Sequence, residues 1–153
     1  MRALIVPQQG AEPDDHWYAF VAERVEAGAL PGLVAAEVRA PQEDDTGAAG
    51  SLILIGHEGA AKTIGGFLSS LPPGREVAGV LLVAPTTEID LHGARRRRVL
   101  LSDDRGYEEA EHWWAERQGA EVAVRPGGKR FYGAHEIAVL VNLAALAMEV
   151  AEG

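Results

Sequence analysis

Short apolar runs rich in β-branched residues recur along this chain, and they constrain its fold more than any other feature. The runs are Ala3–Val6, Leu33–Val38, Leu52–Ile55, Val77–Val83 and Val99–Leu101, with a weaker one at Glu121–Val124. Their apolarity is continuous rather than alternating, which is typical of strands that are buried on both faces of a parallel sheet. The sequence therefore predicts an open, mainly parallel sheet of about six strands.

Stretches with helical spacing separate most of these runs. The predicted helices are His16–Ala27, Gly59–Ser70, Tyr107–Gln118 and a long one from about residue 133 to residue 150. Apolar residues at helical spacing predict the core-facing side of the long helix; they are Ile137, Leu140, Val141, Ala144, Ala145 and Met148. Helices on both faces of a parallel sheet define an α/β domain, and 153 residues fit one such domain, 1–153.

The expected strand order is 2-1-3-4-5-6, with the topological switch point between the first and third strands. Pro7–Gly10 and Gly56–Gly59 should line any pocket at that point. Two connections, Pro41–Gly50 and Thr86–Arg98, contain no convincing helix. We expect a second subunit to cover the sheet face that loses these helices, because a bare apolar face is not normally left in water. The expected state is therefore a homodimer.

Composition and charge argue against several classes of function. The net charge of −9 is opposite to the basic footprint of a nucleic-acid-binding protein, and it disfavours adhesion to anionic membranes. The absence of cysteine excludes disulfides, thiolate metal sites and a cysteine nucleophile. No signal peptide or membrane-spanning run is recognised, so a cytoplasmic protein is expected. We expect the run Arg95–Arg98 to lie in a loop, solvated or paired with carboxylates.

A strand, a tight turn and the start of a helix meet at residues 52–60. The sequence there, Leu-Ile-Leu-Ile-Gly-His-Glu-Gly-Ala, has the layout of the nucleophile elbow G-x-S-x-G of α/β-hydrolases. The position of the nucleophile holds Glu58, and Ala60 replaces the last glycine. A carboxylate has no hydroxyl to activate, so the sequence predicts the scaffold of a hydrolase without its attacking atom.

Further segments follow one another in a familiar order along most of the chain. They are Ala3–Pro7 with Asp15–Tyr18, then Ile53–His57, then Gly79–Ala84. Together they resemble the small serine hydrolases of the retinoblastoma-binding protein nine type. That family has an I-x-I-G-H-S-x-G elbow, a later segment that carries the catalytic acid, and a closing Gly-His-Phe motif. The resemblance implies a single-domain α/β-hydrolase-like fold, here with two crossover helices shortened or missing.

The resemblance also implies where the catalytic triad of the family would fall. Its serine falls on Glu58, its aspartate on Arg105 within Ser102–Tyr107, and its histidine on Arg130 within Gly128–Phe131. Loss of the serine or the histidine alone can lower the rate about 10⁶-fold, roughly 8 kcal/mol of transition-state stabilisation. The resemblance therefore implies a catalytically inactive homologue that acts as a binding or interaction protein.

The charges at these positions suggest what replaced the triad. Triad residues lie within hydrogen-bond reach of one another, so Glu58, Arg105 and Arg130 should converge in one cleft. One interpretation is an ion cluster that fills a vestigial site. The other is a pocket with surplus positive charge that binds a small anion beside a helix N-terminus. The expected ligand-binding residues are Pro7, Gln8, His57, Glu58, Gly59, Arg105 and Arg130.

Other chemistry remains open at this stage. Gly56–Thr63 matches the P-loop pattern G-x-x-x-x-G-K-[ST] except at Ala61, which leaves a weak nucleotide-binding protein as an alternative. Glu58 among phosphate-binding amides argues against it. A hydrolase with relocated residues would use His57 with Ser102 or Asp104, although His57 is expected to pack and hydrogen-bond rather than react.

Metal binding has weaker support in the sequence. The residues it would draw on are His57, Glu58, Asp103, Asp104 and His135. They lack the spacing of known metal motifs, so neither a metal nor another cofactor is expected.

Overall fold

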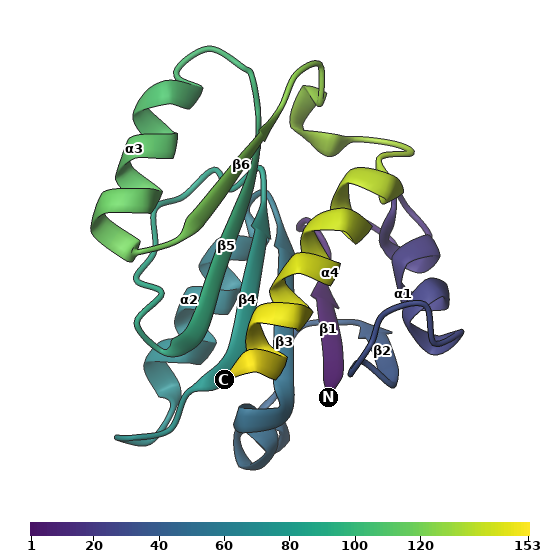
Figure 1. Ribbon diagram of the computed structural model, residues 1–153, viewed down its shortest axis with the longest axis vertical. Helices are drawn as coiled ribbons and strands as arrows, with labels where there is room; N and C mark the ends of the chain where they lie inside the picture. Colours follow the sequence, from purple (N-terminus) through teal and green to yellow (C-terminus); the bar gives the residue numbers. More distant parts are fainter.

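A sheet of six parallel strands forms the centre of the computed structural model, which describes residues 1–153 (Figure 1). The strands are β1 (Arg2–Val6), β2 (Ala35–Val38), β3 (Leu52–His57), β4 (Val77–Val83), β5 (Ala94–Ser102) and β6 (Glu121–Arg125). Their order across the sheet is β2-β1-β3-β4-β5-β6, and every neighbouring pair is parallel. Both the parallel sheet and its strand order are those that the sequence predicts.

Helices cover both faces of the sheet. Helix α1 (Tyr18–Glu26) and helix α4 (Glu136–Glu152) pack on one face, and α2 (Ala60–Ser70) and α3 (Tyr107–Gln118) pack on the other (Figure 1). The chain moves in one direction from β1 to β2 and in the opposite direction from β3 onwards. Right-handed crossovers therefore place α1 and α2 on opposite faces. All four predicted helices are confirmed, although α1 and α4 each begin later than predicted.

The face that carries α2 and α3 is covered by the chain itself. A 3-10 helix, η1 (Glu43–Ser51), occupies the first helix-poor connection and buries Ala49, and the second connection buries Leu91. Beneath them, Leu54 and Val80 have no exposed surface. The expectation of a bare sheet face was wrong, because short segments with a few inward apolar side chains replace the missing helices.

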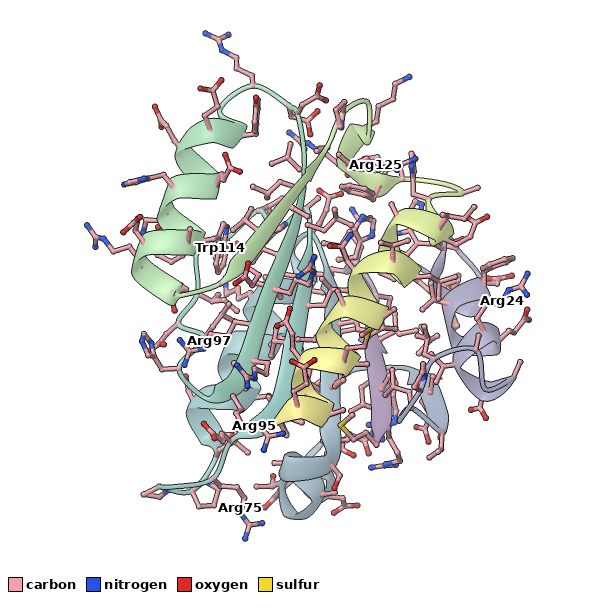
Figure 2. All side chains as sticks on the ribbon, viewed as in Figure 1. Arg24, Arg75, Arg95, Arg97, Trp114 and Arg125 are labelled. Carbon is pink, nitrogen blue, oxygen red and sulfur yellow. The ribbon has the colours of Figure 1, made fainter.

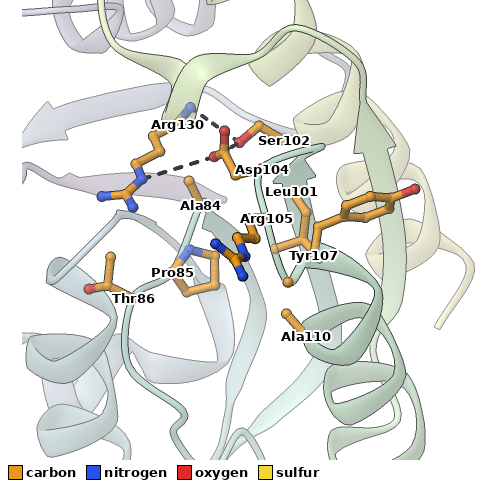
Figure 3. A pocket seen from close by; sticks show the side chains of 11 residues that line it. Ala84, Pro85, Thr86, Leu101, Ser102, Asp104, Arg105, Tyr107, Ala110 and Arg130 are labelled. Atoms are coloured by element: carbon orange, nitrogen blue, oxygen red, sulfur yellow. Dashed lines mark hydrogen bonds and ion pairs between the residues drawn. The ribbon is translucent and has the colours of Figure 1, made fainter.

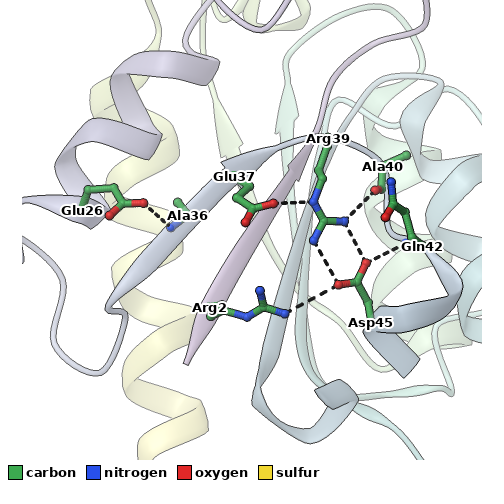
Figure 4. Close-up of polar contacts among 8 residues, drawn as sticks. All are labelled: Arg2, Glu26, Ala36, Glu37, Arg39, Ala40, Gln42 and Asp45. Atoms are coloured by element: carbon green, nitrogen blue, oxygen red, sulfur yellow. Dashed lines mark hydrogen bonds and ion pairs between the residues drawn. The ribbon is translucent and has the colours of Figure 1, made fainter. Parts of the chain in front are cut away.

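A buried carboxylate fixes the path of η1. Asp45 is 4% exposed, and its two oxygens accept hydrogen bonds from the guanidinium of Arg39 at 2.8 and 3.0 Å (Figure 4). The backbone N–H of Gln42 also donates to Asp45, at 2.7 Å, and Arg2 lies 3.6 Å away. The hydrogen bonds from Arg39 lower the pKa of the Asp45 carboxyl. This bidentate pair ties the end of β2 to the connection that leads into β3.

The run Arg95–Arg98 lies in strand β5 and not in a loop, so that expectation was wrong. Long arginine stems can cover apolar surface while their guanidiniums reach polar partners at the sheet margin. Arg98 donates to Asn142 Oδ1 at 2.9 Å and pairs with Glu149 at 3.3 Å. Arg97 donates to a backbone carbonyl at the end of α3, at 2.8 Å (Figure 2). The expected pairing with carboxylates is confirmed for Arg98.

Helix α4 turns mainly a different side to the core from the one that the sequence predicts, although Leu140 and Ala144 of the predicted side are partly buried against it. Of the predicted side, Ile137 is 68%, Val141 62% and Met148 58% exposed. The core-facing residues are Val139, Leu143, Leu146 and Val150. The helix is apolar on both sides, so spacing alone cannot choose between them. The sheet makes the choice, because Gly79 lets Leu146 approach so closely that a Cβ atom there would lie 3.2 Å from it.

The assignment of faces on α4 can be tested with two truncations. Leu146→Ala should lower the free energy of unfolding by about 2–5 kcal/mol, because it leaves a cavity against β4. Ile137→Ala, the matched control on the exposed side, should change it by no more than about 0.5 kcal/mol. Urea unfolding followed by circular dichroism at low protein concentration measures both. Equal losses would contradict the assignment.

Candidate functional site

Strand β3 ends in a strained elbow that holds a carboxylate. Glu58 follows the strand with φ +52°, a left-handed conformation that is uncommon for residues other than glycine. Its backbone N–H donates to the carbonyl of Val83 at 2.9 Å, and α2 begins two residues later, at Ala60. The turn also needs Gly56, where a Cβ atom would lie 2.6 Å from Ile64. The strand, strained turn and helix have the layout of a nucleophile elbow, and the carboxylate of Glu58 stands at the strained position.

A second strained turn faces the elbow. The 3-10 turn η2 (Lys129–Phe131) has φ values of 47°, 59° and 60°, so three consecutive residues adopt the left-handed conformation. Such residues cost on the order of 1–3 kcal/mol each and persist where the surroundings hold them. The indole Nε1 of Trp17 donates to the carbonyl of the last residue at 3.1 Å. Ser102 Oγ accepts from the N–H of the middle residue at 3.2 Å. These bonds present the middle residue, Arg130, to the cleft.

Arg130 lies between two carboxylates. Its Nε is 4.0 Å from Asp104 Oδ2 (Figure 3). Its Nη1 is 4.0 Å from Glu58 Oε2. Glu58 is 5% exposed, and its other oxygen, Oε1, is buried without a hydrogen-bond partner. Contact with the Glu58 carboxylate raises the pKa of the Tyr132 phenol. The predicted approach of Glu58 and Arg130 is therefore present.

Arg105 does not join this ion cluster, so the expected convergence of three ionic groups was wrong for that residue. It makes no ion pair within 4.0 Å, and Asp104 takes the place beside Arg130. The carboxylate of Asp104 also accepts a hydrogen bond from the Ser102 hydroxyl. Asp104 and Arg105 are neighbours in the loop after β5, so a shift of one residue decides whether an anion or a cation lies beside Arg130. The carboxylate next to Arg105 was visible in the sequence, but only the path of this loop shows which of the two lies beside Arg130.

A cavity of about 280 Å³ opens beside Arg130 at the carboxyl ends of β4 and β5. Arg105 and Arg130 line it together with Asp104 and Ser102 (Figure 3). The rest of the wall is formed by Ala84, Pro85, Thr86, Leu101, Gly106, Tyr107 and Ala110. The cavity thus combines an apolar wall with two guanidinium groups.

A second cavity, of about 440 Å³, lies at the topological switch point between β1 and β3. Pro7 and Gln8 line it together with Gly59, as predicted for a pocket at that point. The N–H of Gln8 donates to the Tyr18 hydroxyl at 3.1 Å. Of the expected ligand-binding residues, three line this cavity, Arg105 and Arg130 line the first one, and His57 and Glu58 line neither. Their binding role stays a prediction.

His57 is a structural residue at the end of β3. It has no exposed surface, and its Nε2–H donates to the carbonyl of Arg130 at 2.7 Å. The Tyr18 hydroxyl donates to its Nδ1 at 2.6 Å. Burial lowers the pKa of the imidazole, and burial also raises the pKa of Tyr18 to about 12. Since both ring nitrogens are occupied, His57 packs and hydrogen-bonds as expected.

The remaining observations concern nucleotide binding, metal binding and membrane crossing. Lys62 and Thr63, the last residues of the P-loop-like segment, are exposed on α2. No three histidine, aspartate or glutamate side chains are placed to hold a metal ion. The structure also contains no helix with the length and hydrophobicity that a membrane crossing needs.

Solved structures with the same architecture come from bacteria. The ydeN gene product of B. subtilis has a TM-score of 0.71 and 15% identity, with 99% of each chain covered. A candidate YdeN-like hydrolase from Pectobacterium atrosepticum has a TM-score of 0.62 and 19% identity, with 98% of this chain and 92% of the other covered. A candidate hydrolase of the alpha/beta superfamily from Xanthomonas campestris has a TM-score of 0.63 and 13% identity, with 99% and 98% covered. No family model and no curated protein matches the chain.

These similarities define the fold. The chain has a single-domain α/β fold like that of these structures, with six parallel strands and helices on both sides of the sheet. At identities of 13–19% they show the architecture and not the chemistry.

The buried state of His57 predicts a pH dependence of stability. Its pKa is lowered from 6.5 in the folded protein, so the unfolded chain binds a proton first as the pH falls below 6.5. Stability should fall from that pH downwards, by at most about 1.4 kcal/mol per pH unit, until the folded state also takes up the proton. His57→Gln should lose this component in urea titrations between pH 7 and pH 5, whereas His112→Gln, on the surface of α3, should keep it. An unchanged slope in His57→Gln would contradict the assignment.

Proposed function

We propose that this protein is a non-hydrolytic relative of the small serine hydrolases of the retinoblastoma-binding protein nine type, and that it binds a small anion. The observation that carries the proposal is the carboxylate of Glu58 at the position of the nucleophile, opposite Arg130. Acyl transfer needs a hydroxyl or thiol activated by a general base. The elbow supplies neither.

The surrounding residues support the absence of hydrolysis. A guanidinium stays protonated at neutral pH, so Arg130 cannot act as a general base. His57 is buried, and both of its nitrogens are occupied. The Ser102 hydroxyl is 5% exposed and hydrogen-bonds to a carboxylate with no imidazole between them. This pair is the one specific observation in favour of a hydrolase with relocated residues, and the structural neighbours described as hydrolases are consistent with that alternative.

The charges in the 280 Å³ cavity support an anionic ligand. Arg130 is shared between Glu58 and Asp104, so neighbouring carboxylates compensate its charge. Arg105 has no ion pair within 4.0 Å, and the charged residues that line the cavity, Arg105, Arg130 and Asp104, sum to +1. Guanidinium groups bind carboxylates and phosphates by paired hydrogen bonds. The volume suits a small ligand, since typical ligand pockets begin at about 300 Å³.

The loss of hydrolysis can be tested at the elbow. Neither the wild-type protein nor Glu58→Ser should hydrolyse p-nitrophenyl acetate above the rate of buffer, because no general base faces the introduced hydroxyl. A fluorophosphonate probe should label neither protein. Wild-type turnover that Ser102→Ala abolishes would establish the relocated hydrolase and overturn the proposal. Turnover by Glu58→Ser alone would reveal a base that the geometry does not show.

Binding of an anion can be tested separately by calorimetry at constant ionic strength. Acetate, butyrate and inorganic phosphate serve as the anions, and butyramide serves as the neutral analogue of butyrate. At least one anion should bind more tightly than butyramide, and Arg105→Gln should weaken it at least about 10-fold, or 1.4 kcal/mol. The matched control Arg117→Gln, on the exposed last turn of α3, should bind like the wild type. Equal binding by Arg105→Gln and wild type would overturn the assignment of the cavity.

A further inference from the structure

Helix α4 carries two apolar seams on opposite sides, and the sheet uses only one of them. The inner seam, which packs on the sheet, is Val139, Leu143, Leu146 and Val150. The outer seam is Ile137, Val141, Ala144 and Met148. Both have the alternating spacing of four and three residues that places side chains in one row along a helix. A helix that is apolar on both sides is normally buried on both sides.

The large side chains of the outer seam are exposed, and only the small Ala144 is partly buried against the core. Ile137, Val141 and Met148 are 68%, 62% and 58% exposed, and they are three of the five large apolar residues that the surface exposes. The charged residues of α4 are Glu136, Glu149 and Glu152, all at its ends. Between Ile137 and Met148 the helix therefore presents no charge that would oppose a contact. No other part of residues 1–153 covers this seam.

We propose that the outer seam of α4 is the interface of a homodimer in which the two α4 helices pack antiparallel about a two-fold axis. With the axis between residues 142 and 143, Ile137 meets the partner's Met148 and Val141 meets the partner's Ala144. Large side chains then pair at the two ends, and smaller ones pair near the centre, where two crossing helices approach most closely. The seam is complementary to itself, which is what a two-fold interface requires.

Charge complementarity also favours a second copy in this orientation. Lys129 precedes α4 and Glu152 lies in its last turn, and both are exposed without an ion pair in their own chain. Glu149 is paired with Arg98, and Arg130 lies between Glu58 and Asp104, so Lys129 and Glu152 are the charges left for a second copy. An antiparallel pair places the acidic end of each helix beside the basic segment of the other copy. It also aligns each positive helix N-terminus with a negative C-terminus. A parallel pair would bring acidic end to acidic end in a protein that already has a net charge of −9.

The dimer should be visible by sedimentation velocity between about 1 and 500 μM, with a dissociation constant of the order of 10 μM, because one helix pair is a small interface. Raising the salt concentration should leave the dimer largely intact, since salt screens both the attraction between unlike helix ends and the repulsion between two acidic chains but not the apolar contacts. Val141→Glu should weaken the dimer at least 10-fold, because it places like charges beside the axis. Val34→Glu is the matched control: Val34 is 71% exposed and lies outside α4, so the dimer should persist.

Cysteine pairing tests the orientation, since the chain contains no cysteine of its own. Oxidising a mixture of Ile137→Cys and Met148→Cys proteins should give a disulfide-linked heterodimer. Ile137→Cys alone should give none, because its two copies lie about 16 Å apart along an antiparallel pair, well beyond disulfide reach.

A protein that stays monomeric over the whole concentration range would overturn the proposal and would leave the seam to a helix of a different protein. A dimer that Val141→Glu leaves unchanged would place the interface elsewhere on the molecule. Efficient pairing of Ile137→Cys with itself would overturn the antiparallel orientation. Circular dichroism of each variant at low concentration confirms that the monomer is folded, which separates loss of association from loss of structure.

Discussion

The buried imidazole of His57 holds together the part of the molecule in which the candidate site lies. It ends β3, receives a hydrogen bond from Tyr18 at the start of α1, and donates one to the carbonyl of Arg130 in the strained turn η2. Tyr18 in turn accepts from the backbone N–H that follows β1. These bonds join segments that are 39 and 73 positions apart from His57 in the sequence. Because Tyr18 and His57 have no exposed surface, loss of a partner would leave their polar atoms unpaired at a cost of about 1–3 kcal/mol each.

That framework explains why two strained turns survive side by side. The left-handed backbone of Glu58 and of Lys129–Phe131 is unfavourable by itself, and buried hydrogen bonds hold both turns in place. Strain at a functional site usually serves reactivity. Here the same geometry presents a carboxylate and a guanidinium to each other, and the distance of 4.0 Å leaves the pair looser than a direct hydrogen bond.

The resemblance to small serine hydrolases and the solved structures agree on the architecture and differ in what they say of chemistry. Similarity at 13–19% identity supports the sheet order and the elbow, both of which are backbone properties. The reactive groups are side chains at single positions, and these can change without disturbing the fold. The proposed anion site therefore rests on Arg105 and Arg130 in this chain, and not on the functions of its structural neighbours.

The sequence by itself determined the parallel sheet, its strand order and the elbow at Glu58, because continuous apolar runs and glycine positions depend on local chemistry. The resemblance of Gly128–Phe131 to a Gly-His-Phe motif also predicted that Arg130 lies near Glu58. Only the tertiary structure decided that Asp104 and not Arg105 faces Arg130, because one residue of loop path separates the two outcomes. The same holds for α4, where both sides are apolar and contact with Gly79 selects the inner one. Packing also placed Arg95–Arg98 in β5 and buried Leu91 and Ala49 over the other face, since these positions depend on neighbours that are distant in the chain.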